Sequence, residues 1–205
     1  MTQLELVRPA PLELDSEPRA DHDVIAQLVS DGARVLDVGC GNGALMRLLT
    51  RECSARARGL ELDPSKVHGC VSRGLSVVQG DAERDLDAFP TAAFDYVIFS
   101  HALMKLQRPQ AALKTAARVG ERVIVSINNA GHWRARTKHM FSGRLAAWAD
   151  DAPCTVRDFA EMARSLRLTV ERAVPLSRGH AGAPFAKTLW RANWFSEQAV
   201  FVLSS

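Results

Sequence analysis

Three glycines at alternate positions follow an apolar run that carries a single acid. In the segment 34-RVLDVGCGNGALMRLL-49 the glycines are Gly39, Gly41 and Gly43, and the acid is Asp37. Glycine permits positive φ angles and lets the backbone approach a ligand closely, and a following helix offers unpaired N–H groups. A strand, a glycine turn and a helix in that order bring a ligand to the carboxyl edge of a parallel sheet. The segment therefore predicts a small-molecule binding site.

The glycine spacing alone leaves two ligand classes open. Gly39, Gly41 and Ala44 also satisfy the dinucleotide pattern G-x-G-x-x-G/A. Both readings expect an acid at the end of the second strand to bind ribose hydroxyls, and Glu61 in GLELD stands there. Glu61 therefore does not discriminate between a nicotinamide cofactor and another nucleoside.

Two further acids favour a cationic nucleoside. A buried anion at Asp37 would repel a phosphate near the glycines, whereas it would attract an ammonium group. Asp81, in GDAE after the third expected strand, could accept a hydrogen bond from an adenine amino group. S-adenosylmethionine carries a sulfonium and an α-amino group and no phosphate, so we expect it as the cofactor, with a nicotinamide-dependent oxidoreductase as the disfavoured alternative.

The elements that must position these residues alternate between helix and strand. Apolar periodicity predicts helices at 21–30, 44–53, 63–74, 109–120 and 155–168. Buried apolar runs predict strands at 34–38, 55–62, 76–81, 94–100, 121–128, 168–176 and 197–205. This alternation indicates an α/β fold: a doubly wound, mostly parallel seven-stranded sheet, Rossmann-like, with helices on both faces.

The chain divides into an arm and one domain. Residues 1–19 contain three prolines and predict an irregular N-terminal arm, and 20–205 predict a single domain. Residues 129–153 interrupt the alternation of helices and strands, which indicates an insertion. Residues 177–194 predict a long basic loop. Thr155 with Asp158 three residues later predicts a variant of the helix capping box.

Composition excludes several classes of protein. The net charge of +3 over 205 residues is too weak to indicate nucleic-acid binding, which usually shows a concentrated basic patch. The four cysteines form no C-x-x-C pair, so we expect no disulfide scaffold, no metal site and a cytoplasmic location. We expect no signal peptide and no membrane span, because no apolar run is long enough.

Two histidines are candidates for catalysis. His101 follows the fourth expected strand and His132 follows the fifth. Each has a structural alternative: His101 as a pocket-wall or helix-capping residue, and His132 as an anchor of the insertion. A base is needed only if a methyl acceptor must lose a proton, because the sulfonium is already a good leaving group.

A basic run follows His132. It alternates with Trp133, Met140 and Phe141, which suggests either a solvated helix or a contact surface for an acidic partner or substrate. The cations of this run are Arg134, Arg136, Lys138, His139 and Arg144.

Four motifs in order, VLDVGCGNG, GLELDP, VVQGDAE and FDYVIFSHAL, resemble the class I S-adenosylmethionine-dependent methyltransferases over residues 22–130. The resemblance implies that Asp37 and the three glycines line the methionine end of the cofactor and that Glu61 holds the ribose. It further implies an adenine site and a residue near the sulfonium. These are Leu62 packing on adenine, Asp81 with Ala82 reading its edge, and Ser100 beside the sulfonium. The motif that many amine methyltransferases of nucleic acids carry is replaced by SHAL, so nucleic acid is not the expected acceptor.

A closer resemblance covers residues 24–176. The run from Arg108-Pro109 to Gly131-His132-Trp133-Arg134, together with CTVRDFAEMARSLRL, is similar to the MetW family of methionine biosynthesis. The segment before CTVRDF is shorter than is usual in that family. The resemblance implies a role in methionine biosynthesis beside a homoserine O-acyltransferase. The alternative is a free-standing methyltransferase of a small-molecule acceptor.

Overall fold

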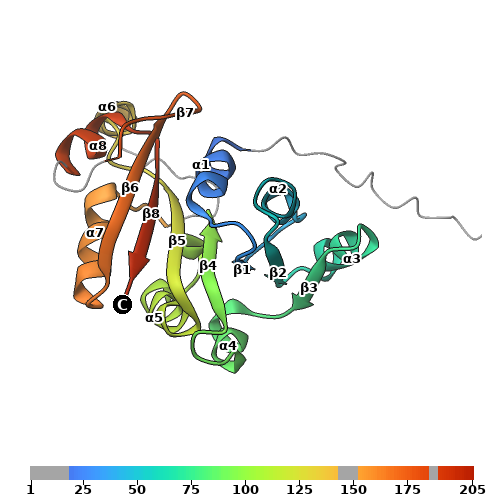
Figure 1. The fold of residues 1–205 in the computed structure, drawn as a ribbon. Helices are drawn as coiled ribbons and strands as arrows, with labels where there is room; N and C mark the ends of the chain where they lie inside the picture. The colour runs from blue at the N-terminus through green and yellow to red at the C-terminus, as the bar shows by residue number, and fades with distance from the viewer. Residues whose placement is uncertain (1–18, 143–151, 185–188) are drawn as a thin grey trace, which may run out of the picture.

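The computed structural model describes residues 19–142, 152–184 and 189–205, and these form one eight-stranded sheet flanked by helices (Figure 1). The expected arm (apart from Arg19), Arg144 and part of the expected insertion lie outside the described residues. The strands are β1 Arg34–Val38, β2 Arg56–Glu61, β3 Ser76–Gln79, β4 Phe94–Ser100, β5 Gly120–Asn128, β6 Thr169–Ser177, β7 His180–Ala181 and β8 Gln198–Ser204. The α-helices are α1 Ala20–Leu28, α2 Ala44–Cys53, α3 Pro64–Ser72, α4 Ala82–Asp85, α5 Pro109–Val119, α6 Trp133–Ser142, α7 Val156–Ser165 and α8 Leu189–Phe195. Two short 3-10 helices, η1 Leu86–Ala88 and η2 Leu103–Lys105, complete the order.

The sheet has the order β3-β2-β1-β4-β5-β8-β6-β7. Strands β1 to β5 pair in parallel, whereas β8 runs antiparallel to both β5 and β6. The chain order reverses between β1 and β4, and ligands of open α/β sheets bind at such a switch point, outside the carboxyl ends of the strands. The expected doubly wound, mostly parallel sheet is confirmed, with the two-residue β7 as an additional edge strand.

Alternating side chains divide the core into two layers. On β4, Val97 and Phe99 belong to the cluster that also contains Leu113 of α5 and Phe159 of α7. Their neighbour Ile98 belongs to the opposite cluster, with residues of α1 and α2. Because successive strand residues point to opposite faces, side chains at the ends of β1, β4 and β5 are assigned to one layer or the other by simple alternation.

The expectation of a long loop at 177–194 needs correction. The segment 177–194, expected to be a loop, contains β7 and all but the last residue of α8. The physical reason for α8 is long-range: the buried side-chain amide of Asn129 donates hydrogen bonds to the carbonyls of Ala192, Asn193 and Ser196 at the end of this helix. No local pattern carries that contact.

The expected capping box at the start of α7 is confirmed. The Thr155 hydroxyl accepts a hydrogen bond from the Asp158 N–H at 3.1 Å, and the Asp158 carboxylate accepts one from the Thr155 N–H at 3.1 Å. Among the described residues, no helix combines the length and the apolar character that crossing a membrane requires.

Candidate functional site

The glycine turn joins β1 to α2 with three residues at positive φ: +74° at Gly39, +57° at Gly41 and +76° at Gly43. A Cβ atom added to Gly39 would lie only 2.8 Å from the Cβ of Ala102, so the loop after β4 requires a glycine there. A Cβ atom added to Gly41 would meet no protein atom within 4 Å. The turn therefore leaves open space directly over its central glycine, as a ligand cradle requires.

Asp37 lies in β1, two residues before the turn, and its side chain is buried. One of its carboxylate oxygens, Oδ1, has no hydrogen-bond partner among the described residues. Burial raises the pKa of Asp37 to about 7, and the charges of Glu61 and Asp21 add to this increase while Arg19 opposes it. A buried carboxylate without a donor needs one, and an ammonium group would both donate hydrogen bonds and stabilise the ionised form.

Glu61 ends β2 and ties the glycine turn to that strand. Its Oε2 accepts a hydrogen bond from the N–H of Gly41 at 2.8 Å, and its Oε1 accepts one from the N–H of Asp63 at 3.0 Å. Each carboxylate oxygen keeps acceptor capacity beyond these bonds, because a carboxylate offers about four lone-pair sites. Glu61 can therefore hold the loop and still accept bonds from the hydroxyls of a ribose.

The open space over the carboxyl edge has two lobes. The larger lobe, of about 370 Å³, runs past the ends of β2, β3 and β4. The smaller lobe, of about 170 Å³, lies between the glycine turn and α1. Both are lined by Arg19, Gly39, Gly41 and Ser100, so they adjoin at these residues.

The sequence-predicted binding residues divide between the two lobes. Asp37 lines the small lobe, and Glu61 lines the large one. Gly43 lines neither lobe; a Cβ atom there would lie 2.3 Å from Leu75, so its role is to admit that side chain. The outer part of the large lobe is lined by Leu62, Lys66, Asp81, Ala82, Lys105 and Leu106.

Asp81 is already engaged as the N-cap of α4, since its Oδ1 accepts a hydrogen bond from the N–H of Glu83 at 2.9 Å. Leu62 is two-thirds exposed and offers an apolar wall to the same lobe. An acid beside an apolar wall suits the edge and the face of a purine ring.

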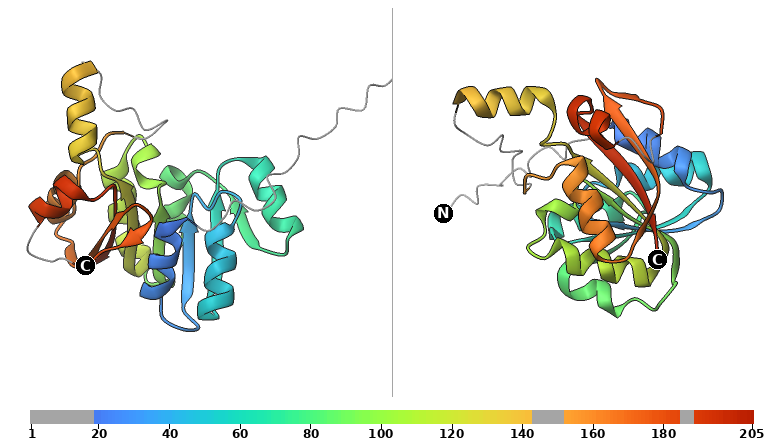
Figure 2. Two further views of the ribbon diagram at one scale, coloured as in Figure 1. Left: turned by 90° about the horizontal axis from the view of Figure 1, so that it is seen from above. Right: turned by 90° about the vertical axis from the view of Figure 1, so that its left-hand side faces the viewer.

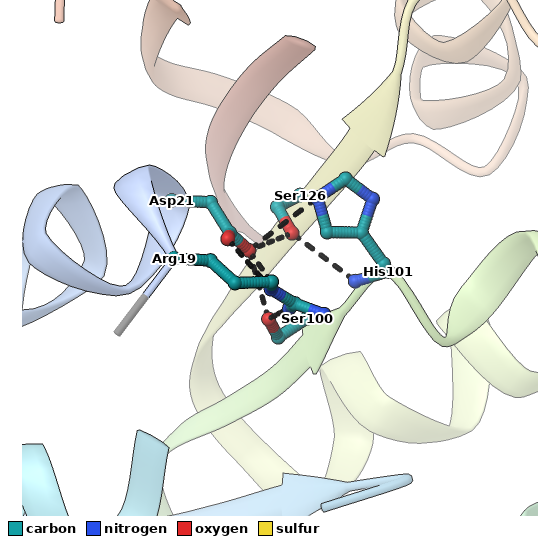
Figure 3. Close-up of polar contacts among 5 residues, drawn as sticks. All are labelled: Arg19, Asp21, Ser100, His101 and Ser126. Atoms are coloured by element: carbon teal, nitrogen blue, oxygen red, sulfur yellow. Dashed lines mark hydrogen bonds and ion pairs between the residues drawn. The ribbon is translucent and has the colours of Figure 1, made fainter. Parts of the chain in front are cut away.

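Polar side chains from the start of α1, from β5 and from the end of β4 form a cluster (Figure 3). Its members Arg19 and Ser100 line both lobes. Ser100 and His101 were expected at the site, whereas sequence reasoning missed Arg19, Asp21 and Ser126. Asp21, in the first turn of α1, is fully buried. Its carboxylate accepts hydrogen bonds from the hydroxyls of Ser100 at 2.8 Å and Ser126 at 2.7 Å, and it pairs with the Arg19 guanidinium at 3.0 Å. Arg19 also donates to the Ser100 hydroxyl.

In this cluster the neighbouring charges outweigh the effect of burial on the pKa of Asp21. Burial alone would raise the pKa of Asp21, but the charges of Arg19, His101 and His22 and the hydroxyl of Ser126 together lower it to about 2. Burial lowers the pKa of His22 to about 4, against the attraction of Asp21. At neutral pH the Asp21 carboxylate is therefore ionised and paired with Arg19.

Strand alternation explains why the two serines meet Asp21. Ser100 and Ser126 are register partners on β4 and β5, and both lie an even number of residues from side chains of the α1-facing core, Ile98 and Ile124. The sequence signal that could have found the cluster is RADHD, a polar group at the start of the first helix, just before its apolar stripe.

His101 lines the large lobe. It stands at φ +53°, which is unusual for a residue other than glycine. Its N–H donates to the Ser126 hydroxyl at 3.1 Å, and its Nε2 lies 3.5 Å from Oδ2 of Asp21. His101 therefore combines a place on the cavity wall with a carboxylate that can orient its ring.

His132 is placed differently. It lines neither lobe. Its Nδ1 accepts a hydrogen bond from the N–H of Arg134 at 3.3 Å, its ring lies 5.9 Å from that of Trp133, and burial lowers its pKa. These contacts fit the alternative in which His132 anchors the start of α6.

The architecture is that of the class I S-adenosylmethionine-dependent methyltransferases. A TehB-like methyltransferase of Corynebacterium glutamicum superposes with a TM-score of 0.63 at 20% identity, covering 92% of this chain and 89% of that one. A 4+2 cyclase, SpnF, superposes with a TM-score of 0.65 at 18% identity, covering 90% and 80%. These identities establish the shared fold alone, and the second name shows that the fold is not restricted to methyl transfer.

The chain belongs to the family of the methionine biosynthesis protein MetW, whose family model matches residues 19–203. The match includes Arg19 and the segment after residue 176, both beyond the resemblance read from the motifs. The matched residues therefore include the polar cluster at the start of α1, helix α8 and nearly all of strand β8.

Curated relatives share parts of the chain. A bifunctional methionine biosynthesis protein MetXA/MetW of Rhodopirellula baltica is 29% identical over 60% of this chain and 21% of its own length. A phthiotriol/phenolphthiotriol dimycocerosates methyltransferase of Mycobacterium leprae is 29% identical over 85% of this chain and 70% of its own. A ubiquinone biosynthesis O-methyltransferase of Xanthomonas oryzae is 37% identical over 53% and 47%. This chain thus matches only about a fifth of the Rhodopirellula protein and about half of the Xanthomonas one.

Proposed function

We propose that the two-lobed cleft binds S-adenosylmethionine. The observation that carries the proposal is the unpartnered, buried oxygen of Asp37 on the small lobe, next to a glycine turn with open space above it. In this arrangement Asp37 receives the α-amino group, Glu61 receives the ribose hydroxyls, and the wall of Leu62, Asp81 and Ala82 receives the adenine. Ser100 lines both lobes, and in this arrangement it lies beside the sulfonium, which joins the two ends of the cofactor.

Isothermal titration calorimetry with S-adenosylmethionine and with S-adenosylhomocysteine tests this proposal directly. We expect saturable binding of both ligands to the wild-type protein and a loss of at least tenfold in affinity on Asp37→Asn. A fluorescence titration with NADH should show no binding. Equal affinity of the wild type and Asp37→Asn for S-adenosylmethionine would mean that Asp37 does not contact the ligand.

We further propose that the protein acts in methionine biosynthesis as the partner of a homoserine O-acyltransferase, in the cytoplasm. Support comes from the family match and from a relative whose single chain carries both the MetXA and MetW names. The four described cysteines are all free, which suits a reducing compartment. Joining two proteins in one chain raises the effective concentration of each for the other. A fusion is therefore advantageous when the two proteins act together.

Co-expression with the host's homoserine O-acyltransferase tests the partnership. We expect the two proteins to co-elute in size-exclusion chromatography and the rate of acyl-homoserine formation to change when this chain is added. Separate elution together with an unchanged rate would remove this role and leave the cofactor proposal intact.

A second candidate function is methyl transfer to a small-molecule acceptor, and His101 is the observation that favours it. The cofactor, when bound, supplies an electrophilic methyl group on its sulfonium and leaves as S-adenosylhomocysteine. His101 lines the large lobe, but both of its ring nitrogens are buried, so its ring would have to turn toward the lobe to take the proton of an acceptor hydroxyl. Asp21, whose Oδ2 lies 3.5 Å from Nε2, would stabilise the imidazolium. Incubation with methyl-labelled cofactor and a metabolite extract tests this function, and a labelled product that disappears in His101→Ala is the expected result.

A further inference from the structure

Helices α6 and α8 form a face that the cofactor proposal does not use. In Figure 2, α6 projects away from the body of the molecule, and α8 lies at its base. Large apolar side chains on the two helices are exposed to solvent. They are Trp133 (42%), Met140 (70%), Phe141 (85%), Trp190 (63%), Trp194 (44%) and Phe195 (59%), and together with Arg134, Arg136 and Arg191 we call them the aromatic–basic face.

One buried amide fixes the base of this face. Asn129, which follows β5, is fully buried. Its Nδ2 donates to the carbonyl of Ser196 just after α8 at 2.7 Å, and its Oδ1 accepts from the N–H groups of Gly131 at 2.9 Å and Val156 at 3.3 Å. Because the same side chain contacts the end of α8, the turn before α6 and the start of α7, the two helices keep a defined position on the sheet.

Arginine and tryptophan meet across the two helices. The guanidinium carbon of Arg136 on α6 lies 4.7 Å from the centre of the Trp194 ring on α8, and its Nε donates to the carbonyl of Gly131 at 2.7 Å. Arg134 lies 5.3 Å from the ring centre of Trp133 on its own helix. Stacking of this kind orders side chains that would otherwise be mobile, and it lowers the entropy lost when a partner binds.

The charge of the face has a single sign. Neither WRARTKHMFS of α6 nor LWRANWF of α8 contains an aspartate or glutamate. Within the part of the chain that the structure describes, no carboxylate pairs with Arg134, Arg136 or Arg191, although most ion pairs elsewhere involve arginine. These cations are therefore available to carboxylates from another molecule.

The apolar residues of α6 also follow a pattern. Trp133, Met140 and Phe141 stand at positions i, i+7 and i+8, which fall on one side of a helix. They form an interrupted apolar stripe, because Arg136 and Thr137 stand between them at i+3 and i+4. An apolar stripe normally covers a core, yet here the last two side chains are the most exposed large apolar residues among those described. A projecting helix with such a stripe and a basic flank matches the binding mode in which a helix enters an apolar groove.

We infer that the aromatic–basic face docks into an apolar groove rimmed by carboxylates on a protein partner, and that this partner is the homoserine O-acyltransferase of the proposed function, on which the inference rests. Charge complementarity selects an acidic groove, since the face carries Arg134, Arg136 and Arg191 and neither helix contains an acid. Tryptophan and arginine are the residue types that most often dominate binding energy at protein interfaces.

The docking face and the cofactor cleft can be tested separately. None of the residues of the aromatic–basic face lines either lobe of the cleft. A variant of the face should therefore keep its affinity for S-adenosylmethionine, and this affinity also reports that the variant is folded.

The test uses a double variant, Arg134→Glu with Phe141→Ser, in which both residues are exposed. The control is Arg164→Glu with Val71→Ser, which makes the same change of charge and removes a smaller exposed apolar side chain, on α7 and α3. Affinity for the acyltransferase is measured by calorimetry at low and moderate salt. We expect the face variant to lose at least tenfold in affinity, the control to lose less than twofold, and the wild-type affinity to fall with salt.

Each contrary result has its own meaning. Unchanged affinity of the face variant, with a wild type that binds, overturns this inference and leaves the partnership standing. Absence of binding by the wild type removes the partnership and this inference together. A wild-type dimer in light scattering that the face variant converts to a monomer, or a nucleic-acid complex lost in the same variant, would assign the face to another occupant and also overturn it.

Discussion

The Ser126 hydroxyl donates a 2.7 Å hydrogen bond to the carboxylate of Asp21, which joins the middle of the sheet to the first turn of α1 across 105 residues of sequence. The same carboxylate holds Ser100 and Arg19, so one buried charge sets the position of α1 over the carboxyl edge. Because α1 and Arg19 form one wall of the small lobe, this contact shapes the cleft as well as the core.

Replacing Asp21 by asparagine should destabilise the fold by about 1.5–3 kcal/mol. The hydroxyls of Ser100 and Ser126 lose an ionised acceptor, whereas the Arg19 side chain is 47% exposed and can be hydrated. The native-state pKa of about 2 means that the stabilisation from this carboxylate is present above the unfolded-state value near 4 and is lost as the pH falls toward 2. Urea unfolding from pH 2.5 to 5 measures both effects. Asp23→Asn, an exposed acid two residues along the same helix, is the control and should change stability by under about 0.5 kcal/mol.

Asp37 should have the opposite dependence on pH. Burial raises its pKa to about 7, so between about pH 4 and 7 the folded protein keeps a proton that the unfolded chain has released. Stability due to Asp37 therefore falls as the pH rises, by about 1.4 kcal/mol per pH unit. His22, whose pKa burial lowers to about 4, contributes a slope of opposite sign up to about pH 6.5.

In the wild type the slopes from Asp37 and His22 offset each other. In Asp37→Asn only the slope from His22 remains, so the unfolding free energy should rise with pH. The measurement is the unfolding free energy of both proteins at pH 4.5, 5.5 and 6.5. A difference between them that does not vary with pH would contradict the raised pKa of Asp37. For the same reason, affinity for S-adenosylmethionine should increase with pH up to about 7, since its ammonium group favours the ionised carboxylate.

Gly41→Ala should separate backbone strain from ligand contact. The left-handed conformation at φ +57° should cost about 1 kcal/mol in stability, and the new methyl group would project into open space over the cleft. The control is Gly74→Ala, at φ +76° in the turn between α3 and β3, where an added Cβ atom also meets no atom within 4 Å. Both variants should lose similar stability in thermal unfolding, but only Gly41→Ala should weaken cofactor binding. Equal cofactor affinities for the two would show that the space above Gly41 is not the ligand's.

Glu61→Gln should loosen the glycine turn even without ligand. The carboxylate uses one oxygen for the N–H of Gly41 and the other for that of Asp63, whereas an amide has a single acceptor oxygen. One backbone N–H would then face an NH₂ group, at a cost of about 1–3 kcal/mol. Chemical denaturation and calorimetry should both report the change, whereas Glu52→Gln, an exposed acid at the end of α2, should affect neither. If Glu61→Gln is as stable as the wild type but binds the cofactor weakly, Glu61 contacts the ligand and does not stabilise the glycine turn.

The amino-acid sequence alone determined most of the elements and predicted the class of ligand site. The strands, most helices, the capping box at Thr155 and the glycine turn rest on contacts within a few residues, where periodicity, φ requirements and side-chain capping act locally. Parallel strands then follow from helix–strand alternation, and this brings Asp37, Glu61 and Asp81 to one edge of the sheet.

Only the tertiary structure decided which other side chains join that edge. Arg19 and Asp21 reach Ser100 and Ser126 from about 80 to 105 residues away, and α8 is capped by Asn129 from more than 60 residues away. His101 and His132 follow neighbouring strands and are equivalent as sequence patterns, yet one lines the cavity and the other anchors α6. These outcomes depend on strand register and on the packing of α1 and α6 against the sheet, and contacts of that kind leave no periodic trace in the sequence.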